Sequence, residues 1–527
     1  MHHLVPYRHL PRIAMALAFA ATSAAAVGAG VPLPAVGNHA VPNPNLIAPD
    51  GDAFGTSMAS GDFNDDGIAD LAIADREHPN LVRVFFGTAW TVGDPVPFPF
   101  VMETIAVPTV PGSTLGPPLA LAAGDFGHDA SDDDDLAIGV PGDSFSADGA
   151  GAVFVFDRAS GGSWSLIATI RQGQNGYPGI SEAGDHFGAS LAVGDFDGNT
   201  LDDLAIGIPG ETTSGQVASG VAYVVYQGVG GLSPAELDVF YRGNNGLTGA
   251  PIANEELGYA LAAGDFNGDG VDDLAVGIPG NPCAGHADAG SVMVLYGRDE
   301  PGGLSAAGVS YWSQTQAGVA DDCENGDRFG SALAAGYFQQ TPLGQAQTHD
   351  LAIGVPGEAI DGVPFAGAVN VLFGGPNGIT ADDNLFLHEG MLPGGSTTIA
   401  GFGLRLAAGR INAGALTRDS LVIASPLANE GGLALAGRLW VVPSVAGALA
   451  PAWAESRRLT PQHAAWPAAS NDAFGATLAL GDFNGDGRND LAIGIPGSDA
   501  TDPGAGIVQV LYQSHHIFVD GFDGGHD

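Results

Sequence analysis

The stretch LAAGDFNGDGVDDLAVGIPG, residues 261–280, returns along the whole chain and decides the fold. Two further copies are nearly identical, at 191–210 and 478–497, and a shorter copy spans 61–74. Degraded copies lie at 122–142, 334–357 and 407–426. The glycines that open the seven copies are Gly61, Gly124, Gly194, Gly264, Gly336, Gly409 and Gly481. Copies spaced by about 70 residues predict a single structural unit that is repeated seven times.

Each unit has the sequence character of four short strands. In the third unit these are LAVGDF (191–196), DLAIGIPG (203–210), AYVVY (222–226) and ELDVFYRG (236–243). The second strand is a near-continuous apolar run, which suits burial on both faces, and the fourth is more polar, which suits an outer strand. Repeated sheets of this size predict an all-β fold, a seven-bladed β-propeller of four-stranded antiparallel blades. A linear β-solenoid is the alternative, but its repeats are usually far shorter.

The seventh unit is one strand short. After its copy of the phrase the sequence offers only GIVQVLY (506–512) as a further strand. The segment 38–47 stands where a fourth strand precedes the next unit elsewhere, so we expect it to pair with the last blade and close the ring. The propeller is therefore predicted to span residues 36–516, with a short acidic tail at 517–527.

Acidic residues dominate the composition. The chain has 59 Asp and Glu against 16 Lys and Arg, contains no lysine, and carries a net charge of −43. Such a surface repels phosphate backbones and anionic membranes, which argues against a nucleic-acid partner. Because 45% of the residues are hydrophobic, the chain can bury a large core and does not resemble a disordered acidic protein.

Residues 1–26 have the features of a secretory signal peptide. Arg8 and Arg12 precede an apolar run, residues 13–27, that ends in small residues. A membrane anchor is the alternative, but the run is short and largely alanine, and no later stretch is apolar enough to span a bilayer. We therefore expect a secreted or cell-envelope protein. In an exported protein the pair Cys283 and Cys323 suggests one disulfide.

Four copies carry the pattern D-x-[DN]-x-[DN]-G-x-x-D, or a close variant, in the loop after the first strand. Carboxylates this crowded repel one another unless a cation lies between them, and oxygen donors without Cys or His favour Ca²⁺. An ordinary hairpin turn is the alternative, but four loops in register favour metal binding. We predict about four calcium ions with these ligands: Asp62, Asn64, Asp66, Asp70, Asp195, Asp197, Asn199, Asp203, Asp265, Asn267, Asp269, Asp273, Asp482, Asn484, Asp486 and Asp490.

The other three loops differ from this pattern. The loop from Asp125 to Asp135 is acidic but two residues longer, and it is a candidate fifth calcium site. In place of the acids, the fifth unit has Tyr337, Gln339 and Gln340, and the sixth has Arg410 and Asn412. No metal is expected in the fifth or sixth unit.

A second motif precedes the first strand of most units. Its copies are Phe54-Gly55, Phe187-Gly188, Phe329-Gly330, Phe402-Gly403 and Phe474-Gly475, with Leu115-Gly116 and Leu257-Gly258 departing from it. Together with Gly-x-Pro-Gly after the second strand, these residues resemble the FG-GAP repeat of the integrin-α N-terminal propeller. The resemblance implies a seven-bladed propeller with calcium in the hairpins of one face, used for adhesion or ligand binding, and similar free-standing propellers occur as exported bacterial proteins. In such a blade Cys283 and Cys323 lie on the face opposite calcium, where a disulfide is sterically plausible.

We predict a monomeric adhesion or ligand-binding module whose loops after the second strands contact a protein or a glycan. Residues such as Asp143, Glu211 and Glu358 lie in these loops. A propeller hydrolase or lyase and a structural envelope protein are the alternatives. Because the sequence holds no nucleophile elbow and no H-E-x-x-H motif, we expect no enzymatic activity.

Overall fold

The computed structural model describes residues 38–42, 54–75, 80–89, 101–108, 114, 116, 120–127, 133–159, 162–299, 302–339, 346–411, 418–444, 456–461, 468–498 and 506–512. The chain divides into two units, Met1–Leu33 and Pro34–Asp527, and all of these residues belong to the second. The predicted signal peptide at 1–26 and the acidic tail at 517–527 lie outside the described residues, as do Gln340 and Asn412.

Within the described residues, the strands form seven antiparallel sheets of four strands each. The first strands are β2 (Phe54–Gly61), β6 (Ala120–Gly124), β10 (Ser190–Gly194), β14 (Leu261–Gly264), β18 (Ala332–Gly336), β22 (Arg405–Gly409) and β26 (Thr477–Gly481). The second strands are β3 (Asp70–Asp75), β7 (Asp135–Val140), β11 (Asp203–Ile208), β15 (Asp273–Ile278), β19 (Asp350–Val355), β23 (Ser420–Ser425) and β27 (Asp490–Ile495). The third strands are β4 (Leu81–Phe85), β8 (Ala152–Ala159), β12 (Val221–Gly228), β16 (Ser291–Tyr296), β20 (Ala368–Phe373), β24 (Arg438–Val442) and β28 (Ile507–Leu511). The fourth strands are β5 (Met102–Ala106), β9 (Ser163–Ile170), β13 (Gly231–Phe240), β17 (Ser305–Trp312), β21 (Thr380–Leu387), β25 (Arg457–Leu459) and, for the seventh sheet, β1 (Asn38–Pro42).

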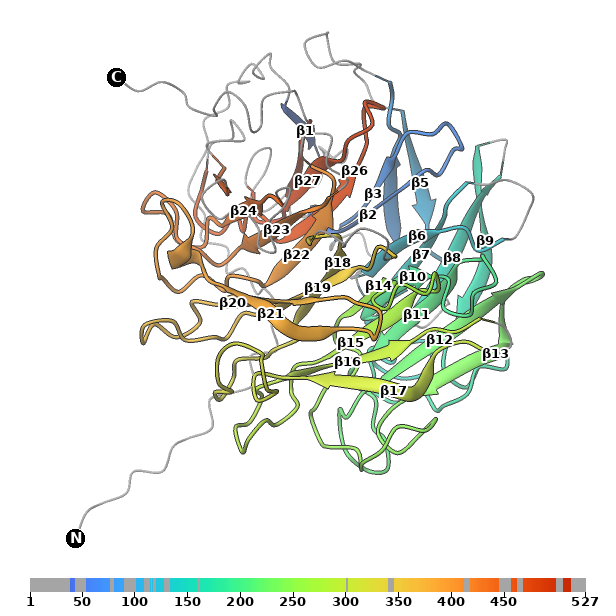
Figure 1. The fold of residues 1–527 in the computed structure, drawn as a ribbon. Helices are drawn as coiled ribbons and strands as arrows, with labels where there is room; N and C mark the ends of the chain where they lie inside the picture. The colour runs from blue at the N-terminus through green and yellow to red at the C-terminus, as the bar shows by residue number, and fades with distance from the viewer. Residues whose placement is uncertain are drawn as a thin grey trace. The chain divides into compact units, whose positions relative to one another are not determined.

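The first strands connect the sheets into a ring. Each contacts the first strand of the next sheet, from β2 and β6 through to β26, which contacts β2 again. The predicted all-β, seven-bladed propeller is therefore confirmed, and Figure 1 shows its blades following one another in chain order. A single 3₁₀ turn, Glu389–Met391, is the only helical element among the described residues. That part of the chain holds no helix long and apolar enough to cross a membrane.

Burial follows the sequence pattern of each strand. Every residue is buried in six of the second strands, namely β7, β11, β15, β19, β23 and β27. Their apolar runs therefore lie between neighbouring blades, as predicted. The fourth strands, such as β5 and β9, consist mostly of exposed and partly buried residues, in keeping with their predicted place at the outer edge.

Strand β1 completes the seventh blade. It pairs antiparallel with β28 in a register that runs from Asn38↔Leu511 to Pro42↔Ile507, which confirms the predicted closure of the ring by the N-terminal strand. Nearer the centre, Ser60 Oγ donates a hydrogen bond to the Leu480 carbonyl at 2.7 Å, so the first and last blades are also joined directly. Figure 1 shows β1, in blue, beside the red strands of the last blade.

Two phenylalanines of the repeat form the core between blades. The rings of the FG and GDF motifs are fully buried at Phe54, Phe63, Phe126, Phe187, Phe196, Phe266, Phe329, Phe402 and Phe474. Phe187 forms a backbone bridge to Gly151 of the preceding blade. Gly188 follows with φ +82°, and a Cβ there would lie 2.9 Å from the Ala152 carbonyl oxygen. The glycine of the motif is therefore needed for both its backbone angle and this close approach.

The ring has two faces, which we name by their loops. The hairpin face carries the loops between first and second strands and the turns between third and fourth strands. The loop face carries the loops after the second strands and the loops that lead to the next first strand. Cys283, after β15, and Cys323, before β18, both lie on the loop face and form a disulfide, with Cα atoms 6.1 Å apart.

Candidate metal centres

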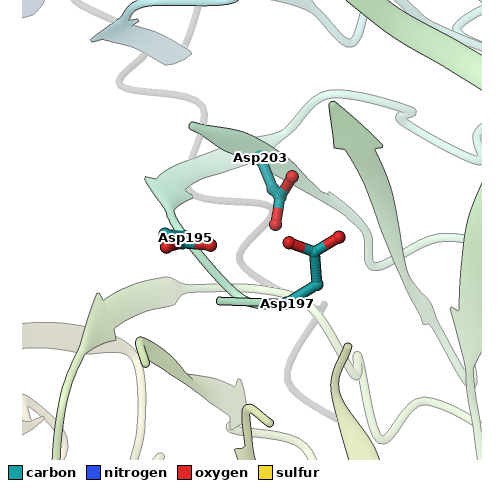
Figure 2. Close-up of side chains that lie close together, drawn as sticks. All are labelled: Asp195, Asp197 and Asp203. Carbon is teal, nitrogen blue, oxygen red and sulfur yellow. The ribbon is translucent and has the colours of Figure 1, made fainter. Parts of the chain in front are cut away.

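The hairpin between β10 and β11 gathers three carboxylates. Oxygen atoms of Asp195, Asp197 and Asp203 all lie within 4.8 Å of one another. Asp195 directly follows β10 and Asp203 begins β11, so the two ends of the hairpin bring them together. Figure 2 shows Asp197 and Asp203 turned toward each other with Asp195 beside them. Asp197 and Asp203 are buried, an environment in which clustered negative charge is costly without a cation.

Backbone N–H groups fix these carboxylates in place. Asp195 accepts hydrogen bonds from the N–H groups of Asn199 at 3.0 Å and Thr200 at 2.8 Å, which bend the loop back on its start. Asp203 accepts from the N–H of Phe196 at 2.9 Å and from that of Gln227 at 2.7 Å. Asp197 accepts the N–H of Asn199 at 3.1 Å. The three carboxylates are therefore held by backbone N–H groups, as a preformed ligand set requires.

The first, fourth and seventh hairpins repeat this backbone. Their first aspartate accepts the N–H of the glycine five residues later, in the pairs Asp62–Gly67 (2.7 Å), Asp265–Gly270 (3.0 Å) and Asp482–Gly487 (2.6 Å). Their last aspartate accepts a phenylalanine N–H, in the pairs Asp70–Phe63 (3.0 Å), Asp273–Phe266 (2.8 Å) and Asp490–Phe483 (3.1 Å). The predicted ligands between these ends are Asn64, Asp66, Asn267, Asp269, Asn484 and Asp486. All predicted ligands therefore lie in four equivalent loops of the hairpin face.

Asn64 tests whether such a loop fits a cation. Its Oδ1 atom is buried and has no hydrogen-bond partner, although the residue stands between Asp62 and Asp66. A buried oxygen without a donor costs about 1–3 kcal/mol, and a metal ion would satisfy it. The side-chain ligands predicted in all four loops are carboxylate and amide oxygens, which are the ligands that Ca²⁺ prefers. These acidic groups could hold ions.

Comparison with known proteins connects the loops to a family. The FG-GAP repeat family matches residues 54–83, 187–225, 257–295 and 474–511, the four units that carry the Asp pattern. Integrin alpha-PS2 of Drosophila melanogaster is 29% identical over 236 residues, 42% of this chain and 14% of that protein. Integrin alpha-5 of Xenopus laevis is 26% identical over 210 residues, 38% of this chain and 16% of that protein.

The chain is an integrin-α-like FG-GAP propeller. It is also similar to phosphatidylinositol-glycan-specific phospholipase D of Bos taurus, with 31% identity over 177 residues, 33% of this chain and 19% of the enzyme. The matched part of the chain thus spans less than a fifth of the length of each of these relatives.

In three of the four candidate metal loops the last aspartate carries an electrostatic cost. Burial, together with the carboxylates of Asp197 and Asp195, raises the pKa of Asp203 to about 8. Burial and neighbouring carboxylates likewise raise the pKa of Asp70 and that of Asp273 to about 8. A cation among these groups favours their charged form and lowers such pKa values. Ion binding would remove a cost that the metal-free loops carry.

The fifth hairpin places an amide where the others place acids. Asp350 stands at the position of Asp203, but it accepts hydrogen bonds from both the side-chain Nε2 (3.0 Å) and the backbone N–H (2.8 Å) of Gln339. The hydrogen bonds from Gln339 lower the pKa of Asp350, although burial still raises that pKa to about 7. That an amide donor stands in place of the acids was not predicted from the sequence. In the sixth hairpin Ser420 takes the same position, and Arg410 follows β22. That neither hairpin binds metal stays a prediction.

The second hairpin keeps part of the common backbone. Asp135 accepts the N–H of Phe126 at 3.1 Å, as the last aspartate does in the four complete loops. Asp125 accepts the N–H of Gly127 at 2.8 Å. Residues 128–132 of this loop lie outside the described residues, so the fifth calcium site stays a prediction.

A set of residues that was not predicted from the sequence links the candidate metal loops to the next blade. Each of these residues directly precedes the second strand of its blade. Its side chain accepts a hydrogen bond from a backbone N–H of the preceding blade, that of the residue just after the first strand. The set is Asp134, Asp202, Asp272, His349, Asp419 and Asn489. For Asp272 this donor is the N–H of Asp195, at 3.3 Å, and the Asp272 N–H donates in return to the Asp195 carbonyl at 2.8 Å. The signal in the sequence is an acceptor-type residue at this position in every unit except the first, which has Ala69. Through these hydrogen bonds, which we call clamps, each candidate metal loop is tied to the neighbouring blade.

The exception at Ala69 gives a test of the clamp. Its N–H donates to the Asp482 carbonyl at 3.0 Å, but alanine has no acceptor to offer in return. We expect Ala69→Asn to raise the free energy of unfolding by about 1 kcal/mol, and Asn489→Ala, which removes the equivalent acceptor, to lower it by a similar amount. Urea unfolding followed by circular dichroism measures both. Two variants that unfold like the wild type would show that the side-chain half of the clamp contributes nothing.

Proposed function

We propose that this protein is an exported, calcium-dependent adhesion module that binds a protein ligand through its loop face. The observation that carries the proposal is the gathering of exposed apolar side chains on that face. Among the described residues eleven large hydrophobic side chains are exposed, and seven of them lie in its loops: Phe145, Ile180, Val217, Phe365, Met391, Ile399 and Leu435. Apolar side chains concentrated on one face are typical of protein interaction sites.

Two of these residues stand at a position that favours small side chains. Phe365 and Leu435 have φ of 54° and 51°, a left-handed conformation that is uncommon for bulky residues. The equivalent residues of the second, third and fourth blades are Gly149, Ala218 and Asp288, with φ between 50° and 67°. A bulky apolar side chain in this conformation, 53% exposed in Phe365, adds nothing to the core. Its presence is better explained by a contact with a ligand.

The calcium and export parts of the proposal rest on other observations. Four equivalent acidic hairpins, the orphaned Asn64 oxygen and the FG-GAP match support calcium. The charged and apolar pattern of residues 1–26 supports export. Because the metal loops join first to second strands and are clamped to the next blade, we assign calcium a structural role in fixing the ring. A fixed ring is what holds the loops of the opposite face in their binding arrangement.

The loop face is tested by paired substitutions. We expect the variant Phe365→Ser/Leu435→Ser to lose at least ten-fold in affinity for proteins that the wild type captures from a panel of purified extracellular proteins and arrayed glycans, measured in calcium. Val229→Ser is the matched control, because Val229 is fully exposed but lies in the turn between β12 and β13 on the hairpin face. Protein binding that is unchanged by the double substitution, or binding of glycans alone, would overturn the proposal.

An enzymatic function is the second candidate, favoured by the similarity to phosphatidylinositol-glycan-specific phospholipase D. That similarity covers 19% of the enzyme, so it carries no assignment of activity by itself. Incubation of the purified chain with phosphatidylinositol-glycan-anchored protein separates the two functions. Release of the anchored protein in calcium, with turnover, would favour the enzyme over the adhesion module.

A further inference from the structure

A second group of carboxylates lies on the loop face, where the sequence analysis expects no metal. Oxygen atoms of Glu324, Asp327 and Glu358, which we call the loop-face trio, lie within 4.8 Å of one another. Glu324 and Asp327 precede β18, and Glu358 follows β19, so the trio is formed by two separate loops of the fifth blade. Asp327 and Glu358 are each 1% exposed, whereas Glu324 is exposed. The group is therefore buried at its base and open at its rim.

The backbone of both loops is fixed around the trio. The Gly357 N–H donates to the Asp327 carbonyl at 3.0 Å, which joins the two loops next to their acidic side chains. The Asp327 carboxylate accepts the N–H of Glu324. Cys323, the residue before Glu324, is held to Cys283 of the fourth blade by the disulfide. The backbone that carries the three carboxylates is thus held in place by these contacts.

Gln314 provides an independent observation that points to a ligand. It lies two residues after β17, is 2% exposed, and donates from Nε2 to Glu358 Oε2 at 2.6 Å. The other terminal atom of the same carboxamide, Oε1, is buried and has no hydrogen-bond partner. A neutral oxygen without a donor therefore lies next to the trio. Buried polar atoms are nearly always paired, and a cation held by the three acids would satisfy this one.

At the neighbouring seam, where the third blade contacts the fourth, an arginine stands where the trio has no positive charge. Arg242, two residues after β13, stands at the position of Gln314, and its guanidinium bridges Glu255 and Asn281. Glu255 and Asn281 occupy the positions of Asp327 and Glu358 in the repeat. In that seam a built-in cation neutralises one carboxylate. In the next seam the arginine is replaced by neutral Gln314, and the asparagine by the carboxylate of Glu358.

We propose that the loop-face trio, with Gln314 Oε1, binds a calcium ion that is separate from those of the hairpin face. Three carboxylates and one amide carbonyl form an all-oxygen ligand set from the protein, which suits Ca²⁺ better than Mg²⁺, because Mg²⁺ usually keeps several waters. The open rim at Glu324 gives the ion access from solvent. The ion would join the loops of the fourth and fifth blades on the same face that carries Phe365.

Crystals of the wild-type protein grown in calcium chloride test the site directly. We expect an anomalous difference peak at about 2.3–2.6 Å from carboxylate oxygens of the trio. Peaks in the hairpin loops without a peak at the trio would overturn this inference alone. A peak at the trio with vacant hairpins would overturn the calcium part of the proposed function and leave this inference standing.

Ion counting with variants gives a second test in solution. Equilibrium dialysis should find one calcium ion fewer per chain in Glu358→Gln than in the wild type. It should find the same loss in Gln314→Arg, which copies the arrangement at Arg242. Glu256→Gln is the control, because it removes a carboxylate of the same face that pairs with Arg328 outside the trio. An unchanged count in Gln314→Arg, or an equal loss in the control, would overturn the assignment.

Discussion

Removing calcium with EDTA is expected to lower the Tm of the protein by on the order of 10–20 °C. A ligand present at a hundred times its Kd stabilises the folded state by about 2.7 kcal/mol per site, so four hairpin sites together contribute on the order of 10 kcal/mol. In the metal-free chain the carboxylates of Asp70, Asp203 and Asp273 stay buried beside other acids, and this uncompensated burial is the physical reason for the loss. Differential scanning calorimetry in calcium and in EDTA measures the shift.

Two controls separate calcium binding from other effects of the chelator. Calcium added back should restore the Tm, whereas the same concentration of Mg²⁺ should not, because Mg²⁺ gives up its waters reluctantly. In Asp203→Asn the difference in Tm between calcium and EDTA should shrink by about a quarter, whatever the substitution does to the metal-free protein, because one of four sites is lost. An identical Tm in calcium and EDTA would rule out a structural role for the ions.

The fold could be predicted from the sequence because the same pattern of strands and turns recurs in seven units. The apolar run at 203–208 predicts a buried strand, and the polar run at 236–243 predicts an outer one; β11 and β13 agree with both. Strand β1 was predictable by counting alone, since the seventh unit lacks a strand and the segment before Phe54 has no other partner. The predicted segment continued to residue 47, and its part from residue 43 lies outside the described residues.

The contacts between blades could not be predicted in the same way. Asp272 and Asp195 are 77 residues apart, and nothing in the local pattern says that the first accepts a hydrogen bond from the second. From the sequence alone, Asp272 resembles one more acidic residue of the candidate metal loop. Its side chain instead accepts a hydrogen bond from the neighbouring blade. Gln339 is a similar case, because the sequence shows the loss of an acid but not that the amide then donates to Asp350. Single-unit patterns specify strands and turns, whereas these roles depend on which units become neighbours.

A chain shortened to begin at residue 43, without β1, is expected to lose about 3–6 kcal/mol of unfolding free energy and to self-associate. The pairing of β1 with β28 extends over five residue pairs, and each hydrogen bond lost contributes about 0.5–1.5 kcal/mol. Its removal also leaves β28 as an open edge strand, and such edges pair with other chains.

The matched control for this deletion begins at residue 34, the start of the second unit, and keeps β1. Urea unfolding and light scattering of the two chains measure stability and association. A synthetic peptide of residues 34–47 should bind the shortened chain, restore part of its stability and suppress its association, because it refills the vacant fourth position of the last blade. Equal stability and a monomeric state for both chains would mean that the ring is closed by the inner strands alone, through contacts such as that of Ser60 with Leu480.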